Sequence, residues 1–170
     1  MTTLKEGRLA HSFPAGWVAA KYDDWAFYRN QFAGACGGNK AVDLVAVDPL
    51  GATLWLVEIK DYRRYRRGKA VAMPLEVALK VRDTLAGLLA AKSRAVGPEK
   101  FVSNRSASAD RIRIVFHLEQ PATHSRLFPR VFDRAVVQQA IRRLVKPIDP
   151  HPLVVELAAM GGIPWTAASA

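Results

Sequence analysis

Cysteine is almost absent from this chain, because Cys36 is the single cysteine among 170 residues. One cysteine cannot form an intramolecular disulfide, and it cannot supply a zinc site of the cysteine-rich type. His11, His124 and His151 have no partner at the spacing of metal ligands. The chain is therefore not built for an oxidising compartment.

Apolar runs long enough to cross a membrane are also lacking, since none approaches the roughly 20 residues that a span needs. Residues 1–7 carry charges where a signal peptide would have its apolar region. We therefore expect an intracellular, cytoplasmic protein.

Acidic residues are scarce relative to basic ones. Fifteen Asp and Glu stand against 25 Lys and Arg, which leaves a net charge of +10. Such a balance favours polyanionic partners, nucleic acid before an acidic membrane. Half of the residues are hydrophobic. This composition and length predict a single domain over residues 1–170, with loose ends at about 1–10 and 161–170.

Two short apolar runs stand close together near the middle of the chain. Aliphatic and β-branched residues over 41–47 and 52–59 predict two strands. Residues 48–51 between them read Asp-Pro-Leu-Gly, which is typical of a turn. The segment therefore predicts a β-hairpin whose second strand is central and buried.

Three charged residues belong to this hairpin. If the loop has two residues, Asp43 lies opposite Leu56 and diagonal to Glu58 on the same face of the sheet. Lys60 follows on that face, because strand side chains alternate with a period of two. We therefore expect Asp43, Glu58 and Lys60 to converge.

Two interpretations account for these charges at the end of a buried strand. In the first, Glu58 and Lys60 form an ion pair where the strand emerges. In the second, Asp43 and Glu58 bind a hard divalent cation, and Lys60 lies beside the water that attacks a phosphate. The basic segment that follows favours the second interpretation.

The order of these residues resembles a known family. Asp43, followed by Glu58-x-Lys60 on the second strand of a hairpin, resembles the core of the PD-(D/E)XK nuclease superfamily, whose fold is called restriction-endonuclease-like. Residues 38–46 and 56–60 are similar to its Holliday-junction-resolvase-like branch.

The resemblance implies a metal site. Mg²⁺ or Mn²⁺ would be held by Asp43, Glu58 and the backbone carbonyl of Ile59. Asp24, or its neighbour Asp23, would supply a further acidic ligand from upstream of the hairpin.

A basic segment begins directly after Lys60. It could be a solvated loop, or it could contact the phosphates and bases of a nucleic acid. In the second case the contacts are Tyr62, Arg63, Arg64, Tyr65, Arg66, Arg67 and Lys69. The alternative binding surface consists of Arg111, Arg113, Arg142 and Arg143.

The remaining pattern completes an α/β fold. We expect a restriction-endonuclease-like αβββαβ core, in which a mixed central sheet is flanked by helices. Residues 98–110 are expected to form a polar loop, and His117 and Glu119 to lie on a solvated strand face. The expected helices cover 17–33, 74–92 and 131–145, and the expected strands cover 41–47, 52–59, 111–119 and 153–157.

The function expected from these features is that of a Mg²⁺-dependent nuclease, an endonuclease that hydrolyses phosphodiester bonds of DNA. Two alternatives stay open. One is a non-catalytic nucleic-acid-binding or assembly module with the same fold, and the other is an RNA-cleaving nuclease. Whether the protein acts as a homodimer is open as well.

Overall fold

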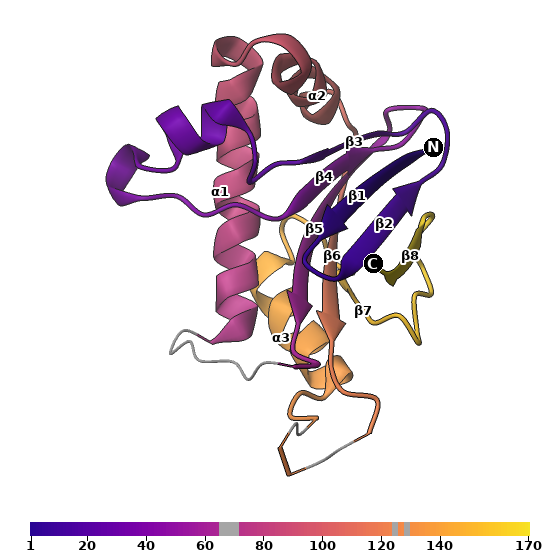
Figure 1. Cartoon of the computed structure of the whole chain (residues 1–170). Coiled ribbons are helices and arrows are strands. Elements are labelled where there is room, and N and C mark those ends of the chain that lie inside the picture. The colour runs from indigo at the N-terminus through magenta and orange to yellow at the C-terminus, as the bar shows by residue number, and fades with distance from the viewer. Residues whose placement is uncertain (65–71, 124–125, 128–129) are drawn as a thin grey trace.

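The computed structural model describes residues 1–64, 72–123, 126–127 and 130–170. A five-stranded sheet in the order β3-β4-β5-β6-β7 forms its centre (Figure 1). The pairs β3/β4 and β4/β5 are antiparallel, whereas β5/β6 and β6/β7 are parallel, so the sheet is mixed. Its strands are β3 (Val18–Lys21), β4 (Leu44–Val47), β5 (Thr53–Asp61), β6 (Arg111–Glu119) and β7 (Leu153–Val155).

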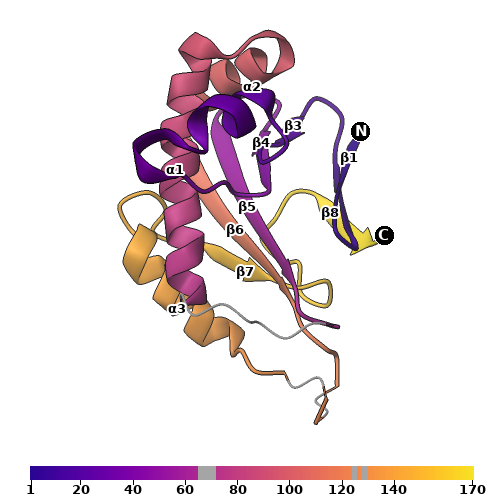
Figure 2. The ribbon, with the colours of Figure 1, turned by 60° about the vertical axis from the view of Figure 1, so that its left-hand side comes forward.

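Helices cover one face of this sheet, and a smaller sheet covers the other (Figure 2). The helices are α1 (Met73–Arg94), α2 (Gly97–Ala107) and α3 (Arg134–Val145). The smaller sheet has the order β1-β2-β8, built from β1 (Thr2–Glu6), β2 (Leu9–Phe13) and β8 (Thr166–Ser169). The prediction of an α/β fold with a mixed sheet flanked by helices is confirmed at this level.

Strand β5 is buried on both faces because its side chains alternate between the two layers. Leu54 and Leu56 belong to the apolar cluster under the helices. Trp55, Val57 and Ile59 belong to the cluster under the smaller sheet. The nearly continuous apolar run of the sequence therefore marks a central strand, as predicted.

The hairpin between β4 and β5 has a longer loop than predicted. Leu44 pairs with Val57, so the four residues 49–52 form the loop in place of two. The register differs from the predicted one by two positions, which keeps every side chain on its predicted face. Continued by one residue, this register puts Asp43 directly opposite Glu58.

The first predicted helix is wrong over much of its length. Residues 18–21 form strand β3, which pairs with β4, and a helical turn of the π type covers Tyr28–Phe32. The aromatic spacing of residues 17–33 suggested one helix. The free edge of β4 offers backbone partners to residues 18–21, and this sheet pairing overrides the local pattern.

The predicted loop at 98–110 is also wrong, because α2 lies there. Its serines do not break the helix. The Ser103 hydroxyl donates to the Glu99 carbonyl oxygen at 2.8 Å, which satisfies it within the helix. Val102, Ser103 and Ser106 are buried on one side, so packing against α1 stabilises α2.

The two ends of the chain are paired with each other and are not loose as predicted. Strand β2 lies between β1 and β8, with Leu9 opposite Ser169. Leu9 and Trp165 are buried under this small sheet. The pairing joins residues more than 150 positions apart, so no local pattern announces it.

The small sheet also buries a polar cluster that was expected to be solvated. His117 and Glu119 are 0% and 6% exposed, and the His117 Nε2 lies 2.8 Å from a Glu119 carboxylate oxygen. The His11 ring lies 5.0 Å from the His117 ring, and the Trp165 indole N–H donates to the His11 Nδ1 at 3.0 Å. Burial, followed by the nearby His117, lowers the pKa of His11 to about 4.

The other predicted elements are confirmed. Helices at 74–92 and 131–145 correspond to α1 and α3, and strands at 111–119 and 153–157 correspond to β6 and β7. Within the described residues, no helix is long and apolar enough to cross a membrane.

Gly87 sets how closely α1 approaches the sheet. A Cβ at this position would lie 1.9 Å from the Tyr22 hydroxyl oxygen and 3.0 Å from the Phe32 ring. Gly87→Ala is therefore expected to lower the free energy of unfolding by about 1–3 kcal/mol through overpacking. In an open helix position the same change gains up to about 1 kcal/mol. Urea denaturation measures the difference.

Tyr22→Phe provides the matched control for this prediction. The Tyr22 hydroxyl has no hydrogen-bond partner among the described residues, so its removal costs little. The double variant Tyr22→Phe/Gly87→Ala is expected to recover much of the lost stability. A Gly87→Ala protein as stable as wild type would contradict the close approach.

His11 predicts a pH dependence of stability. The folded protein keeps His11 neutral down to about pH 4, whereas an unfolded chain protonates it below 6.5. Between these values the unfolded state binds more protons at His11, so the contribution of His11 to the free energy of unfolding rises with pH, by at most about 1.4 kcal/mol per pH unit. Urea denaturation across this window measures the slope.

His11→Gln is expected to lower the slope by this contribution, whereas the exposed His151→Gln should leave it unchanged. Glu119 does not obscure the result. Burial acts to raise the pKa of Glu119, but hydrogen bonds from His117 and Leu157 lower it below its ordinary value of 4.5. Its contribution is therefore lost only at more acidic pH. An equal slope in both variants would refute the assignment.

Candidate functional site

Four charged side chains meet between β5 and α1, and we call them the carboxylate–lysine cluster: Asp43, Glu58, Lys60 and Lys80. Asp43 immediately precedes β4. Glu58 and Lys60 are two positions apart on β5, so both side chains lie on the face of the sheet that the helices cover. Lys80 comes from α1, in the layer above. The three residues that the hairpin pattern predicted are therefore brought together, and a fourth joins them.

The Lys80 ammonium occupies the centre of the cluster. Its Nζ donates to both Glu58 carboxylate oxygens, at 2.7 and 2.9 Å, and lies 3.6 Å from the Asp43 Oδ1. The Lys60 Nζ lies 2.5 Å from the Glu58 Oε1. The Ile59 backbone N–H donates to the other Asp43 oxygen at 2.6 Å. Two carboxylates are thus balanced by two ammonium groups.

Burial dominates the electrostatics of this cluster. Glu58 is 1% exposed, and burial together with the Asp43 charge raises the pKa of Glu58 to about 7. Burial acts to lower the pKa of Lys60, but the carboxylates of Glu58 and Asp43 outweigh it and raise that pKa. Lys60 therefore stays charged and helps to hold the Glu58 carboxylate in place.

Sequence reasoning missed Lys80, although a signal was present. Val77 and Val81 are buried against the sheet, and Lys80 lies next to them on the helix surface. Glu76, four residues before Lys80, is 3% exposed. An acid and a lysine four positions apart beside an apolar stripe mark that helix face as charged, but they do not identify Glu58 as the partner of Lys80.

Asp23 and Asp24, the two acidic residues upstream of the hairpin, have different surroundings in the structure. Asp24 is exposed and forms ion pairs with Lys21, at 3.1 Å, and with Arg29. Asp23 interacts electrostatically with the carboxylate–lysine cluster. Burial, followed by the charge of Asp43, raises the pKa of Asp23 to about 6. Asp24, predicted as a metal ligand, is thus engaged elsewhere.

The site does not fit the predicted Mg²⁺ or Mn²⁺ as it stands. A cation shared by Asp43 and Glu58 would need the position that the Lys80 ammonium fills. Along the described ranges, no group of three or more His, Cys, Asp or Glu side chains could hold a metal ion. Metal binding by Asp43, Glu58 and the Ile59 carbonyl therefore stays a prediction.

The basic segment is only partly within the described residues. The Tyr62 ring packs 5.8 Å from the Phe132 ring. The Arg63 guanidinium donates to both Asp61 carboxylate oxygens and to the Ser169 hydroxyl. Arg64 is exposed. The predicted contacts that lie outside the described residues are Tyr65, Arg66, Arg67 and Lys69.

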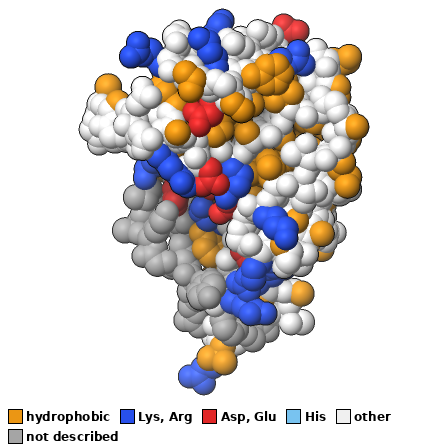
Figure 3. Space-filling model, turned by 45° about the horizontal axis from the view of Figure 1, so that its top comes forward, with side chains coloured by type: hydrophobic (Ala, Val, Ile, Leu, Met, Phe, Trp, Pro, Cys, Tyr) orange, Lys and Arg blue, Asp and Glu red, His pale blue; other side chains and the backbone are white. Residues whose placement is uncertain are grey.

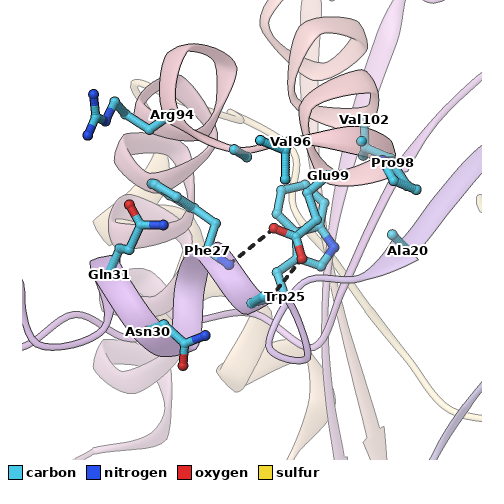
Figure 4. Close-up of a pocket in the computed structure, with 13 residues that line it drawn as sticks. Ala20, Trp25, Phe27, Asn30, Gln31, Arg94, Val96, Pro98, Glu99 and Val102 are labelled. Atoms are coloured by element: carbon cyan, nitrogen blue, oxygen red, sulfur yellow. Dashed lines mark hydrogen bonds between the residues drawn. The ribbon is translucent and has the colours of Figure 1, made fainter.

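A separate hollow of about 520 Å³ lies where the α1–α2 junction meets the turn after β3 (Figure 4). Trp25 and Phe27 help to line it. The Glu99 carboxylate accepts the backbone N–H groups of Ala26 and Phe27 at 2.7 and 3.1 Å. These bonds satisfy the carboxylate, so Glu99 fastens the turn to α2. No member of the carboxylate–lysine cluster lines this hollow.

Comparison with known proteins gives one informative relative. No family model and no solved structure matches the sequence. The chain is 34% identical over 168 aligned residues to the cysteine–tRNA ligase of Neisseria meningitidis serogroup A, serotype 4A. The alignment covers 79% of this chain but 24% of the ligase. The chain thus spans about a quarter of the length of the curated relative that it matches.

This similarity corrects the predictions of family and function. The relative is named as a ligase for tRNA, so the assignment to the PD-(D/E)XK superfamily is wrong, and so are the DNA nuclease activity and the endonuclease class. The motif behind them involves three side chains, Asp43, Glu58 and Lys60. With Lys80, the same residues form a charge-balanced buried network. What the chain resembles is a quarter of a tRNA ligase.

Proposed function

We propose that this chain is a tRNA-binding domain related to one part of an aminoacyl-tRNA synthetase. The observation that carries the proposal is the 34% identity to a cysteine–tRNA ligase, of which this chain spans about a quarter. The two proteins share a segment of about this size. A shared role in binding tRNA would account for it, with other parts of the ligase performing other steps. The partner expected from the charge was nucleic acid, and the relative favours RNA over DNA.

The charge distribution supports a polyanionic partner. Lys and Arg side chains spread over the face shown in Figure 3, whereas Asp and Glu gather in a few places. A phosphate backbone binds such a surface through released counterions. Exposed side-chain cations with no hydrogen bond or ion pair within the described part of the chain include Lys5, Arg64, Arg111, Arg142, Arg143 and Lys146.

In this proposal the carboxylate–lysine cluster is an anchor. Strand β5, which precedes the basic segment, ends at Asp61, and α1, which follows it, begins at Met73. Lys80 binds Glu58 and so joins the N-terminal half of α1 to the C-terminal half of β5. Asp43, Glu58, Lys60 and Lys80 thereby hold the strand and the helix on either side of the segment together.

The finer description of the fold is part of the same proposal. The order β3-β4-β5-β6-β7, with antiparallel pairs followed by parallel pairs, is compatible with a restriction-endonuclease-like core. We treat it as a scaffold for binding. A single domain over residues 1–170 is likewise proposed, and neither a preference for DNA nor a homodimer has support.

Binding to tRNA is the direct test. Fluorescence anisotropy should show tRNA bound at least tenfold more tightly, about 1.4 kcal/mol, than duplex DNA with the same number of phosphates. The affinity should fall linearly with salt on a double logarithmic scale. It should persist in chelator. Equal or tighter binding of the DNA would reject the proposal.

Lys80→Met tests the anchor. The change leaves buried Glu58 with one cation fewer, and we expect a loss of about 3 kcal/mol in the free energy of unfolding because Lys60 remains. Glu58 needs the cation only when ionised, and its pKa is raised to about 7. The loss should therefore be larger near pH 8 than near pH 5.5. Urea denaturation measures both, with exposed Lys92→Met as control.

The same variant tests the predicted metal. If Lys80 fills the cation position, millimolar Mg²⁺ should leave the thermal midpoint of the wild-type protein unchanged. It should raise the midpoint of Lys80→Met, because a bound ion stabilises the state that binds it. A clear rise in the wild-type midpoint would contradict the expectation that Lys80 keeps Mg²⁺ from the folded wild-type protein.

A further inference from the structure

Helix α3 carries a concentrated positive charge on its outer side. A hollow of about 400 Å³ is lined by Gln139, Arg142, Arg143 and Lys146, all of which are exposed. The opposite side of the helix is apolar, with Val137, Ile141 and Val145 buried against α1 and the sheet. Packing therefore fixes the helix and leaves the three cations facing solvent. We call this surface the α3 basic hollow.

No carboxylate among the described residues pairs with these three cations. Other arginines of this part of the fold do have carboxylate partners. Arg130, four residues before α3, and Arg134, its first residue, lie 2.7 and 3.9 Å from Glu156 oxygens. Arg113 on the neighbouring strand lies 3.4 Å from Asp149. The charge of the α3 basic hollow is thus available to an external anion.

The dipole of helix α3 stabilises part of this positive charge. Cations in a last turn interact favourably with the macrodipole, and Arg142 and Arg143 occupy that turn. Lys146 then lies three and four positions from them, where like charges repel on a helix surface. A partner that carries several negative charges removes this repulsion, which the dipole of one helix does not.

A second hollow beyond the helix carries both signs of charge. Residues 147–151 lead from Lys146 to this hollow, of about 410 Å³, whose lining includes Arg111 and Arg113 but also Asp110 and Asp149. Arg113, also in its lining, donates to the His151 carbonyl oxygen and so shapes the wall. Because its lining contains both signs of charge, this second hollow does not extend the α3 basic hollow.

We propose that the α3 basic hollow is the surface that contacts the phosphate backbone of the bound RNA. This rests on the proposed function and names the place where it acts. Arg142 and Arg143 can each present two parallel N–H groups to one phosphate, and Lys146 adds a point charge. The Gln139 amide supplies a further donor. The donors face a hollow rather than a flat surface, which suits a backbone more than a lipid layer.

The test is a triple variant, Arg142→Gln/Arg143→Gln/Lys146→Gln, titrated with tRNA from low to moderate salt. Three lost phosphate contacts should make the slope of log affinity against log salt shallower by roughly two to three. The matched control, Lys92→Gln/Arg94→Gln/Lys100→Gln, removes the same charge near the α1–α2 junction. It should leave the slope nearly unchanged. Circular dichroism and the thermal midpoint verify that both variants are folded.

Each outcome decides the proposal. If wild-type protein binds tRNA and the triple variant keeps its slope, the inference fails while the proposed function stands. If wild-type protein does not bind tRNA, both fail. If the triple variant loses binding only to phosphatidylglycerol vesicles, the hollow is a lipid surface and the inference fails. Should the triple variant unfold, Arg142→Gln and Arg143→Gln separately should each reduce the slope by about 0.7–0.9.

Discussion

The ion pair between Lys80 and Glu58 is the interaction on which the centre of the molecule depends. Glu58 lies on a strand covered on both faces, where an unpaired carboxylate would be costly. The Lys80 ammonium, which also neighbours Asp43, makes that burial possible and fixes α1 on the sheet. Lys60 completes the charge balance. Once these groups are paired, the apolar residues of β5 can pack on both sides.

The two layers on either side of the sheet are stabilised by different means. Under the helices, the close approach at Gly87 and the apolar cluster around β5 hold α1 in place. Under the smaller sheet, the Trp165 ring packs on Phe13, and its indole N–H donates to His11, whose ring contacts the ring of His117. Both ends of the chain close over this side, so the layer exists only when the whole chain has folded.

The functional argument changes once the charges are sorted by their partners. The acidic motif of the hairpin, which favoured a nuclease, is neutralised by lysines from its own strand and from α1. Arg63 is held by Asp61. Arg142, Arg143 and Lys146 on α3 have no such partner among the described residues, and we propose RNA as the anion that they contact. The buried charges therefore serve the fold, whereas the exposed cations of α3 are the ones that we propose for binding.

Several features follow from the sequence alone, because they depend on local spacing. The period-two pattern determined β5 and the shared face of Asp43, Glu58 and Lys60, and a register shift of two left that face intact. Other features were decided by tertiary structure. Lys80 reaches Glu58 across 22 positions, and β8 pairs with β2 from the far end of the chain. Such contacts leave no local period, since each residue gains its partner only after the layers assemble.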